Sequence, residues 1–251
     1  MKFAIIIFII LLIILCILYK VKIKWKSFFH RGFAANRGNF GIYCYCGKQG
    51  TGKTYSVVEY LLDNKKKIEV YCNIGGITGI EYTHFTGFNE LIELKHKLDR
   101  GEIGQDKSKQ LVFVYDEIFT ELQKHSKLNS EVLDFLCQMR KRKIIFLTTA
   151  QEWAEIPLTF RRFCRYEIDT HMYNLGIFSI LWKQFKDAEN MKWSEIDQEH
   201  VAPLVSNTIT KTRKYIANSY DTFLRISSST TGELLSNSPS SDNETNARAT
   251  L

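Results

Sequence analysis

The chain has 251 residues, 45% of them hydrophobic, which is enough to bury one substantial core together with appendages. Its formal net charge is +7. This charge indicates an anionic partner only weakly, because much of the excess lies in one short segment near the N-terminus. The 6 cysteines show no paired metal-ligand spacing. The composition therefore argues against a zinc site or a disulfide framework, and we expect small core residues in a reducing compartment.

The N-terminal segment, residues 3–19, is apolar without a break (FAIIIFIILLIILCILY). As a helix this run would be about 26 Å long, and Val21, Ile23 and Trp25 can extend it toward the thickness of a bilayer. A cleaved signal peptide is the competing interpretation. It usually has an apolar region of about 7–15 residues and a small-residue cleavage site, whereas this run ends in YKVK. The sequence therefore predicts one transmembrane helix within residues 1–24.

The charges around this segment predict its orientation. Lys20, Lys22, Lys24, Lys26 and Arg31 follow the apolar run, whereas only Lys2 and the terminal amine precede it. The positive-inside rule then places the N-terminus outside and everything after the run in the cytoplasm. The same basic cluster could contact anionic lipid headgroups. Residues 25–38 are expected to be a connector.

A glycine-rich motif follows a short apolar strand. Residues 40–46 (FGIYCYC) are typical of a buried strand, and residues 47–54 (GKQGTGKT) satisfy G-x-x-x-x-G-K-[ST]. In such a loop the glycines bring bare backbone N–H groups against nucleotide phosphates, and the following helix adds the positive end of its dipole. Lys53 would contact the β- and γ-phosphates, and the Thr54 hydroxyl would ligate Mg²⁺. The predicted nucleotide-binding residues of the loop are Gly47, Lys48, Gln49, Gly50, Thr51, Gly52, Lys53 and Thr54.

The second chemical element lies about 60 residues further along. After a predicted strand at 68–72 and a helix at 88–100, a hydrophobic strand (LVFVY, 111–115) ends in Asp116 and Glu117. An apolar run that ends in two acids is common, but after a phosphate loop it is the usual partner of that loop. Asp116 would hold the Mg²⁺ with Thr54, and Glu117 would polarise the attacking water.

A third strand, residues 144–149 (IIFLTT), is followed by Ala150 and Gln151. In nucleotidases with an extra strand between the loop strand and the Asp-Glu strand, a polar residue at its end senses the γ-phosphate. Gln151 is the candidate, although it could also be an ordinary strand-end glutamine. The chain has no Asn-Lys-x-Asp guanine-recognition motif, so we expect ATP rather than GTP.

A helix that begins at Asn129 or Ser130 is predicted to run to about Arg142 and to end in RKRK (140–143). These cations could simply complement the helix dipole. Alternatively, Arg140 or Arg142 acts as an arginine finger on the nucleotide of a neighbouring subunit, or belongs to a DNA-contacting surface. Further finger candidates are Arg161, Arg162 and Arg165.

The remaining chain is less informative. Residues 164–171 and 176–186 alternate enough to form a strand hairpin, which completes a predicted ATPase domain at 39–186. Residues 187–226 form a mixed, charged C-terminal extension in which Lys211, Arg213 and Lys214 offer a weak basic patch. Residues 227–251 are rich in Ser, Thr and Asn and are predicted to be a disordered tail.

The combination of GKQGTGKT, VFVYDE, a basic helix end and FLTTAQEW resembles the FtsK–HerA superfamily of DNA-pumping ATPases. Within it, the chain is most similar to the zonular occludens toxin-like family, the membrane-anchored assembly ATPases of filamentous phages. The similarity covers about residues 38–170. The order of the parts differs, because the apolar segment here precedes the ATPase motifs, as it does in conjugative coupling proteins.

These patterns predict an α/β fold, a three-layer P-loop NTPase with a mainly parallel sheet behind one N-terminal transmembrane helix. The resemblance implies an ATPase that uses ATP and Mg²⁺ as a homo-oligomer such as a hexamer. Its expected partners are the membrane, single-stranded DNA, and phage or secretion assembly proteins. The expected activity is DNA translocation or extrusion of a filamentous phage. Two alternatives are a conjugation-type coupling ATPase and a membrane-tethered scaffold that uses ATP to switch assembly.

Overall fold

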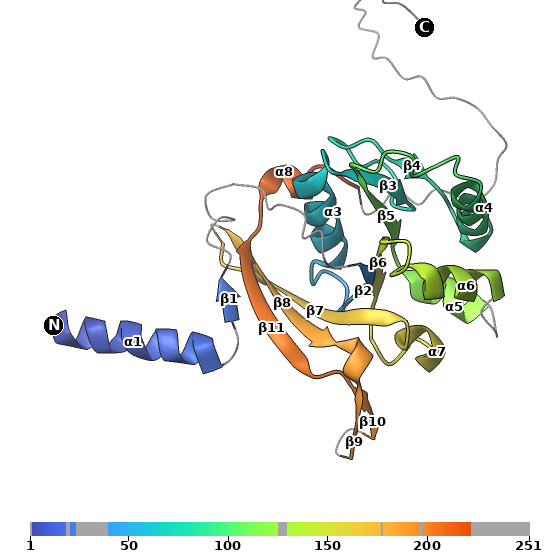
Figure 1. Ribbon diagram of the computed structural model, residues 1–251. Helices are drawn as coiled ribbons and strands as arrows, with labels where there is room; N and C mark the ends of the chain where they lie inside the picture. Colours follow the sequence, from blue (N-terminus) through green and yellow to red (C-terminus); the bar gives the residue numbers. More distant parts are fainter. Residues whose placement is uncertain are drawn as a thin grey trace, which may run out of the picture.

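The computed structural model describes residues 2–18, 21–23, 40–124, 130–176, 178–195 and 198–221. Within these ranges one sheet has the strand order β1-β11-β8-β7-β2-β6-β5-β3-β4, and β9 and β10 form a separate pair (Figure 1). The strands are β1 (Val21–Ile23), β2 (Gly41–Cys46), β3 (Ile68–Cys72), β4 (Thr83–His84), β5 (Gln110–Tyr115), β6 (Ile145–Ala150), β7 (Cys164–Asn174), β8 (Ser179–Asp187), β9 (Lys192–Ser194), β10 (Glu199–Val201) and β11 (Leu204–Lys211).

The central strands β7, β2, β6, β5, β3 and β4 are parallel to one another. Strand β6 lies between β2 and β5, so the extra strand expected between the loop strand and the Asp-Glu strand is present. The central strands read as near-continuous apolar runs because helices bury both faces of a parallel sheet. The predicted α/β fold with a mainly parallel sheet is confirmed.

Helices on the two faces of the sheet make it the middle of three layers. Side chains of α3 (Lys53–Asn64) and of the short α8 (Lys214–Ala217) pack into the hydrophobic cluster that contains Tyr45 of β2. The opposite cluster contains Ile42 and Cys44 of the same strand, because successive side chains of a strand point to opposite faces. Side chains of four helices fill that cluster: α4 (Phe88–Asp99), α5 (Ile118–Lys124), α6 (Ser130–Gln138) and α7 (Leu158–Arg161).

Helix α6 ends earlier than its sequence predicts. It stops at Gln138 rather than near Arg142, and the chain then turns through Lys143, whose φ of 55° is left-handed. This turn reverses the chain so that β6 can begin at Ile145 beside β5. Asn129, one of the two predicted first residues of this helix, lies outside the described residues.

The predicted hairpin is present, since β7 and β8 pair in antiparallel fashion. The sheet continues past residue 186, because β11 pairs with β8 and β1 pairs in parallel with β11. Between β8 and β9 lies a single 3₁₀ turn, η1 (Ala188–Asn190). The predicted connector at 25–38 and the predicted tail at 227–251 lie outside the described residues.

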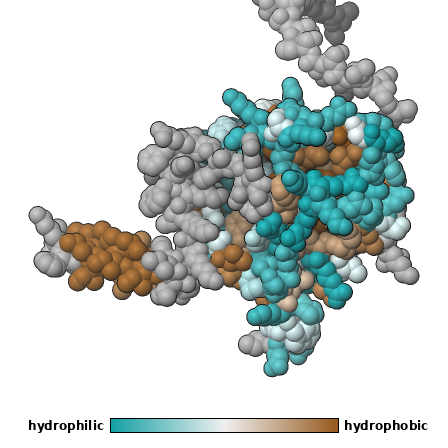
Figure 2. All heavy atoms as spheres, in the orientation of Figure 1, coloured by the Kyte–Doolittle hydropathy of each residue, from teal (hydrophilic) through white to brown (hydrophobic). Residues whose placement is uncertain are grey.

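The apolar N-terminal segment forms helix α1 (Lys2–Leu18), which has 17 residues. None of the helices in the described residues is long and apolar enough to cross a membrane, so the predicted transmembrane helix is not found. Val21 and Ile23, which were expected to extend the apolar run, belong instead to strand β1. The side chains of residues 5–15 are 46–65% exposed and form the brown rod in Figure 2.

The cysteines occupy mostly interior positions, as their composition suggested. Cys44, Cys46, Cys72 and Cys164 are buried free thiols, whereas Cys137 is exposed. Burial raises the pKa of the Cys44 and Cys164 thiols above its ordinary value, which favours the neutral, apolar form. These four residues therefore act as small core side chains.

Candidate active site

The glycine-rich loop lies between β2 and α3 at the carboxyl ends of the parallel strands. Gly47 and Gly52 have φ values of 145° and 90°, which favour glycine. A Cβ atom at Gly47 would lie 2.9 Å from the carbonyl oxygen of Thr170 on β7, and one at Gly52 would lie 2.7 Å from Met172 Cε. The β7–β8 hairpin thus packs against the loop, and its close approach requires glycine at both positions.

Lys53 is the first residue of α3, and its side chain folds back over the loop. Its Nζ donates to the carbonyl oxygens of Gly47, at 2.6 Å, and Lys48, at 3.0 Å. Burial lowers the pKa of Lys53, and the nearby Asp116 and Glu117 act in the opposite direction. The ammonium group is therefore held beside backbone that can cradle phosphates, as the motif predicts.

Asp116 follows the last residue of β5 and faces the start of α3. Thr54 Oγ1 donates to Asp116 Oδ2 at 3.2 Å, and Thr149 Oγ1 donates to Asp116 Oδ1 at 2.6 Å. Burial raises the pKa of Asp116, an effect that the hydrogen bond from Thr149 opposes and the nearby Glu117 carboxylate reinforces. A bound cation would compensate this poorly solvated carboxylate. The hydroxyl of Thr54 and the carboxylate of Asp116 are the hard oxygen ligands that Mg²⁺ prefers, so these residues fit the expected metal.

Two residues that the sequence did not single out fix the acidic pair. Asn73, directly after β3, donates from Nδ2 to the Asp116 carbonyl at 3.0 Å, and its Oδ1 accepts from Asp116 N at 2.6 Å. Thr149 Oγ1 accepts from Glu117 N at 2.8 Å. Glu117 itself has a φ of 54°, rare for a residue other than glycine, and it is exposed. Hydrogen bonds from Asn73 and Thr149 therefore fix the backbone of Asp116 and Glu117, and with it the position of both carboxylates.

Gln151 lies beside the loop, because its carbonyl accepts from Gly47 N at 3.1 Å. Its side chain is exposed, so its role as a γ-phosphate sensor stays a prediction. The other predicted loop residues, Lys48, Gln49, Gly50 and Thr51, are in place between β2 and α3, and Thr51 Oγ1 lies 3.2 Å from Thr170 Oγ1.

The arginine candidates lie elsewhere. Arg140 and Arg142 precede β6, at the edge of the sheet opposite the loop, where they pair with Glu189 at 2.8 Å and Asp99 at 2.5 Å. Arg161, Arg162 and Arg165 lie near the start of β7, at the same edge. One chain therefore does not bring these arginines to its own loop. A finger reaching from a neighbouring subunit remains a prediction for Arg140 and Arg142.

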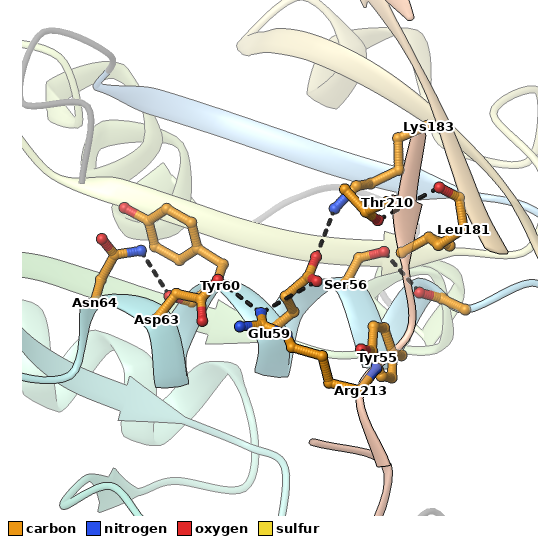
Figure 3. Close-up of polar contacts among 11 residues, drawn as sticks. Tyr55, Ser56, Glu59, Tyr60, Asp63, Asn64, Leu181, Lys183, Thr210 and Arg213 are labelled. Carbon is orange, nitrogen blue, oxygen red and sulfur yellow. Dashed lines mark hydrogen bonds and ion pairs between the residues drawn. The ribbon is translucent and has the colours of Figure 1, made fainter. Parts of the chain in front are cut away.

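A buried charge network attaches the loop helix α3 to β8 and to the segment that follows β11 (Figure 3). Arg213, after β11, contacts Asp63 at 2.7 Å and Glu59 at 3.2 Å, and Lys183 of β8 contacts Glu59 at 2.9 Å. The backbone N of Arg213 also donates to the hydroxyl of Tyr55 at 2.7 Å. All four charged side chains are at most 7% exposed. This network fixes α3, whose first two residues are Lys53 and Thr54, against β8 and the segment after β11.

Comparison with models of protein families finds no match, and a search of curated proteins finds none either. Solved structures similar in fold include the N-terminal domain of zonular occludens toxin from Neisseria meningitidis, with 15% identity and a TM-score of 0.45 over 73% of this chain and 100% of that chain. A second is the DNA-packaging ATPase B204 of Sulfolobus Turreted Icosahedral Virus, with 12% identity and a TM-score of 0.43 over 66% and 98%.

A third is a KaiC-like protein from Pyrococcus horikoshii, with 9% identity and a TM-score of 0.44 over 73% of this chain and 97% of that chain. The structural neighbours therefore include the kind of protein that the sequence motifs resemble, at low sequence identity.

Proposed function

We propose that the chain hydrolyses ATP and uses the energy to move nucleic acid. The observation that supports hydrolysis is the 3.2 Å contact between Thr54 and Asp116, which brings the loop helix and the Asp-Glu strand together in one site. Thr54 and Asp116 would hold Mg²⁺, which when bound neutralises charge on the β- and γ-phosphates. Lys53 and the loop N–H groups bind the phosphates, and the Glu117 carboxylate accepts a proton from the attacking water.

The proposed working form is a homo-oligomer. Among the described residues, no arginine forms a hydrogen bond or an ion pair with residues 47–54, so this part of the chain supplies its own site with no guanidinium to stabilise the charge of the transition state. A neighbouring subunit would supply it, and such fingers raise turnover by about 10³–10⁵-fold in other P-loop enzymes. The motif resemblance supports a DNA cargo and, more finely, a role in assembly or extrusion of a filamentous phage.

ATP turnover with and without single-stranded DNA tests this proposal, with Lys53→Ala as the inactive control. A motor shows turnover that DNA stimulates and that rises with protein concentration as subunits assemble. The alternative, a scaffold that uses ATP to switch assembly, hydrolyses ATP without a response to DNA. Absence of turnover under all these conditions would refute the enzymatic proposal itself.

We also propose that α1 holds the ATPase at a membrane surface, with the catalytic domain on the cytoplasmic side. The exposed apolar side chains of residues 5–15 support this location, because a helix apolar on all sides is poorly solvated in water. Co-flotation of the full chain with lipid vesicles is the measurement, and a variant without residues 2–18 is the control. Equal recovery of both proteins in the lipid-free fraction would contradict the proposal.

A further inference from the structure

A lysine-rich surface lies at the amino ends of three neighbouring parallel strands, on the edge opposite the phosphate loop. Lys66 and Lys67 directly precede β3, Lys109 precedes β5, and Lys141 and Lys143 precede β6. All five side chains are exposed, and none forms an ion pair with another residue that the structure describes. We call these five residues the lysine patch.

Hydrogen bonds across the strand starts make the patch continuous. The backbone N of Gln110 donates to the Lys67 carbonyl at 2.7 Å, and the side-chain amide of Gln110 donates to the Lys143 carbonyl. Strands β3, β5 and β6 are adjacent in the sheet, and neighbouring strands lie about 4.8 Å apart, so their starts span about 10 Å. Five unpaired positive charges are thus gathered in a small area.

A hollow of ≈ 460 Å³ opens within this surface, beside β3. Lys65, Lys66 and Lys109 contribute to its lining. It can form there because β4 pairs with β3 only at Tyr71 and Cys72, which leaves the first part of the outer edge of β3 uncovered by β4. Glu69 and Glu81 line the hollow too, so its lysines outnumber its carboxylates by three to two. The attraction for a polyanion therefore comes from the exposed lysines around the hollow as well as from those that line it.

We propose that the lysine patch binds the sugar-phosphate backbone of a nucleic acid strand. The inference deepens the proposed function, because it identifies the surface of the motor that holds the cargo. A phosphate backbone offers repeated single charges that match lysines on successive strands. A lipid surface fits less well, because membrane-binding surfaces also carry large apolar side chains. Within the described residues, the exposed large apolar side chains lie on α1, β9, β11, α8 and the β7–β8 hairpin.

The lysine patch and the nucleotide-binding loop lie at opposite ends of the parallel strands. Strand β5 has 6 residues, which corresponds to about 20 Å at about 3.3 Å per residue. Lys109 stands before this strand and Asp116 directly follows it. ATP at the loop and a strand at the lysine patch would therefore bind together, whereas a polyanion attracted to Lys48 and Lys53 of the loop would compete with ATP.

The test measures the affinity of the full chain for a labelled oligothymidylate across a salt series. The variant Lys67→Gln/Lys143→Gln removes two charges of the patch. The control Lys192→Gln/Lys214→Gln removes two exposed charges outside the patch, one on β9 and one on α8, and gives the same net charge. Each phosphate contact with a single strand contributes about 0.7 to the slope of log affinity against log salt, so the patch variant should lose about 1.4 from this slope. The control should keep the parental slope, and ATP should not displace the oligonucleotide.

Equal slopes for the patch variant and the control would overturn the inference, as would displacement of the oligonucleotide by ATP. A second experiment measures binding of the same proteins to vesicles of anionic phosphatidylserine. If the patch variant loses vesicle binding but keeps oligonucleotide binding, the patch binds lipid and the inference is overturned. Failure of the two proposals can be distinguished. Oligonucleotide binding that depends on the patch, without DNA-stimulated turnover, would contradict the proposed motor and support the lysine patch. DNA-stimulated turnover in a patch variant whose affinity for the oligonucleotide is unchanged would support the motor and contradict the patch.

Discussion

Replacing Arg213 by methionine should destabilise the domain strongly. The guanidinium is 1% exposed and contacts Glu59 and Asp63, so its loss leaves two buried carboxylates with one remaining cation, Lys183. Breaking a buried ion pair from one side costs about 3–5 kcal/mol. We expect the lower end, about 3 kcal/mol, because Nε and Nη1 of Arg213 have no hydrogen-bond partner among the described residues, so part of the desolvation cost is uncompensated already. For a chain of this size the melting temperature should fall by about 6–12 °C.

The matched control is Lys183→Met, read in the same thermal unfolding experiment by circular dichroism. It leaves Glu59 with Arg213 as a partner, and it does not touch Asp63, so the loss should be smaller than for Arg213→Met. Adding Asp63→Asn to Arg213→Met should recover part of the stability, because it removes one unpaired buried charge. If Arg213→Met unfolds at the parental temperature, or no lower than Lys183→Met, the network does not hold α3 as we argue.

Other predictions concern the active site. Lys53→Ala should abolish binding of a fluorescent ATP analogue, whereas Glu117→Gln should bind it normally and lose turnover; parental turnover in Glu117→Gln would remove Glu117 as the base. Thr149→Val loses the hydrogen bonds to Asp116 and Glu117. It should lower turnover about 10–100-fold, by analogy with residues that support metal ligands, whereas Thr149→Ser should retain parental turnover. Equal turnover in the two variants would show that the hydroxyl is dispensable. Gly52→Ala should destabilise the domain by about 1–3 kcal/mol more than Gly50→Ala in chemical denaturation, since a new Cβ clashes with Met172 and Leu181 only at Gly52. Equal losses would assign the effect to backbone conformation alone.

Sequence patterns predicted the parts of this fold that local chemistry determines. The phosphate loop, its helix, β3 and the Asp-Glu strand each depend on a few consecutive residues, and the structure places them where the patterns put them. Asn73 and Thr149 escaped notice because their role depends on strand order. Both residues are distant from Asp116 in sequence. Their side chains reach Asp116 only because β3, β5 and β6 are adjacent in the sheet. Polar residues at the carboxyl ends of parallel strands were the signal that could have found them.

The chain beyond residue 186 was hard to interpret for a different reason. In β11 the buried side chains include Ser206, Asn207, Thr208 and Thr210, so the strand lacks the apolar alternation that marks an ordinary strand. Arg213 was expected to belong to a basic surface patch with Lys211 and Lys214, and that expectation is wrong for Arg213. Its partners Glu59 and Asp63 lie 154 and 150 residues earlier in the chain, and their burial turns a surface-like residue into a core one.

The same three strands connect the active site to the lysine patch. Strand β3 has Lys67 before it and Asn73 after it, β5 has Lys109 and Asp116, and β6 begins two residues after Lys143 and contains Thr149. A strand within a packed sheet is stiff, so a shift of β3, β5 or β6 relative to its neighbours moves both of its ends. Such a shift would couple the geometry around Asp116 to the spacing of the lysines, with no need for a separate mobile loop or domain. Lys67→Gln/Lys143→Gln should therefore keep the basal ATPase rate, because neither lysine touches the site, and should require more DNA for half-maximal stimulation. A patch variant whose basal rate and response to DNA both stay parental would show that the lysine patch and the active site are not coupled in this way.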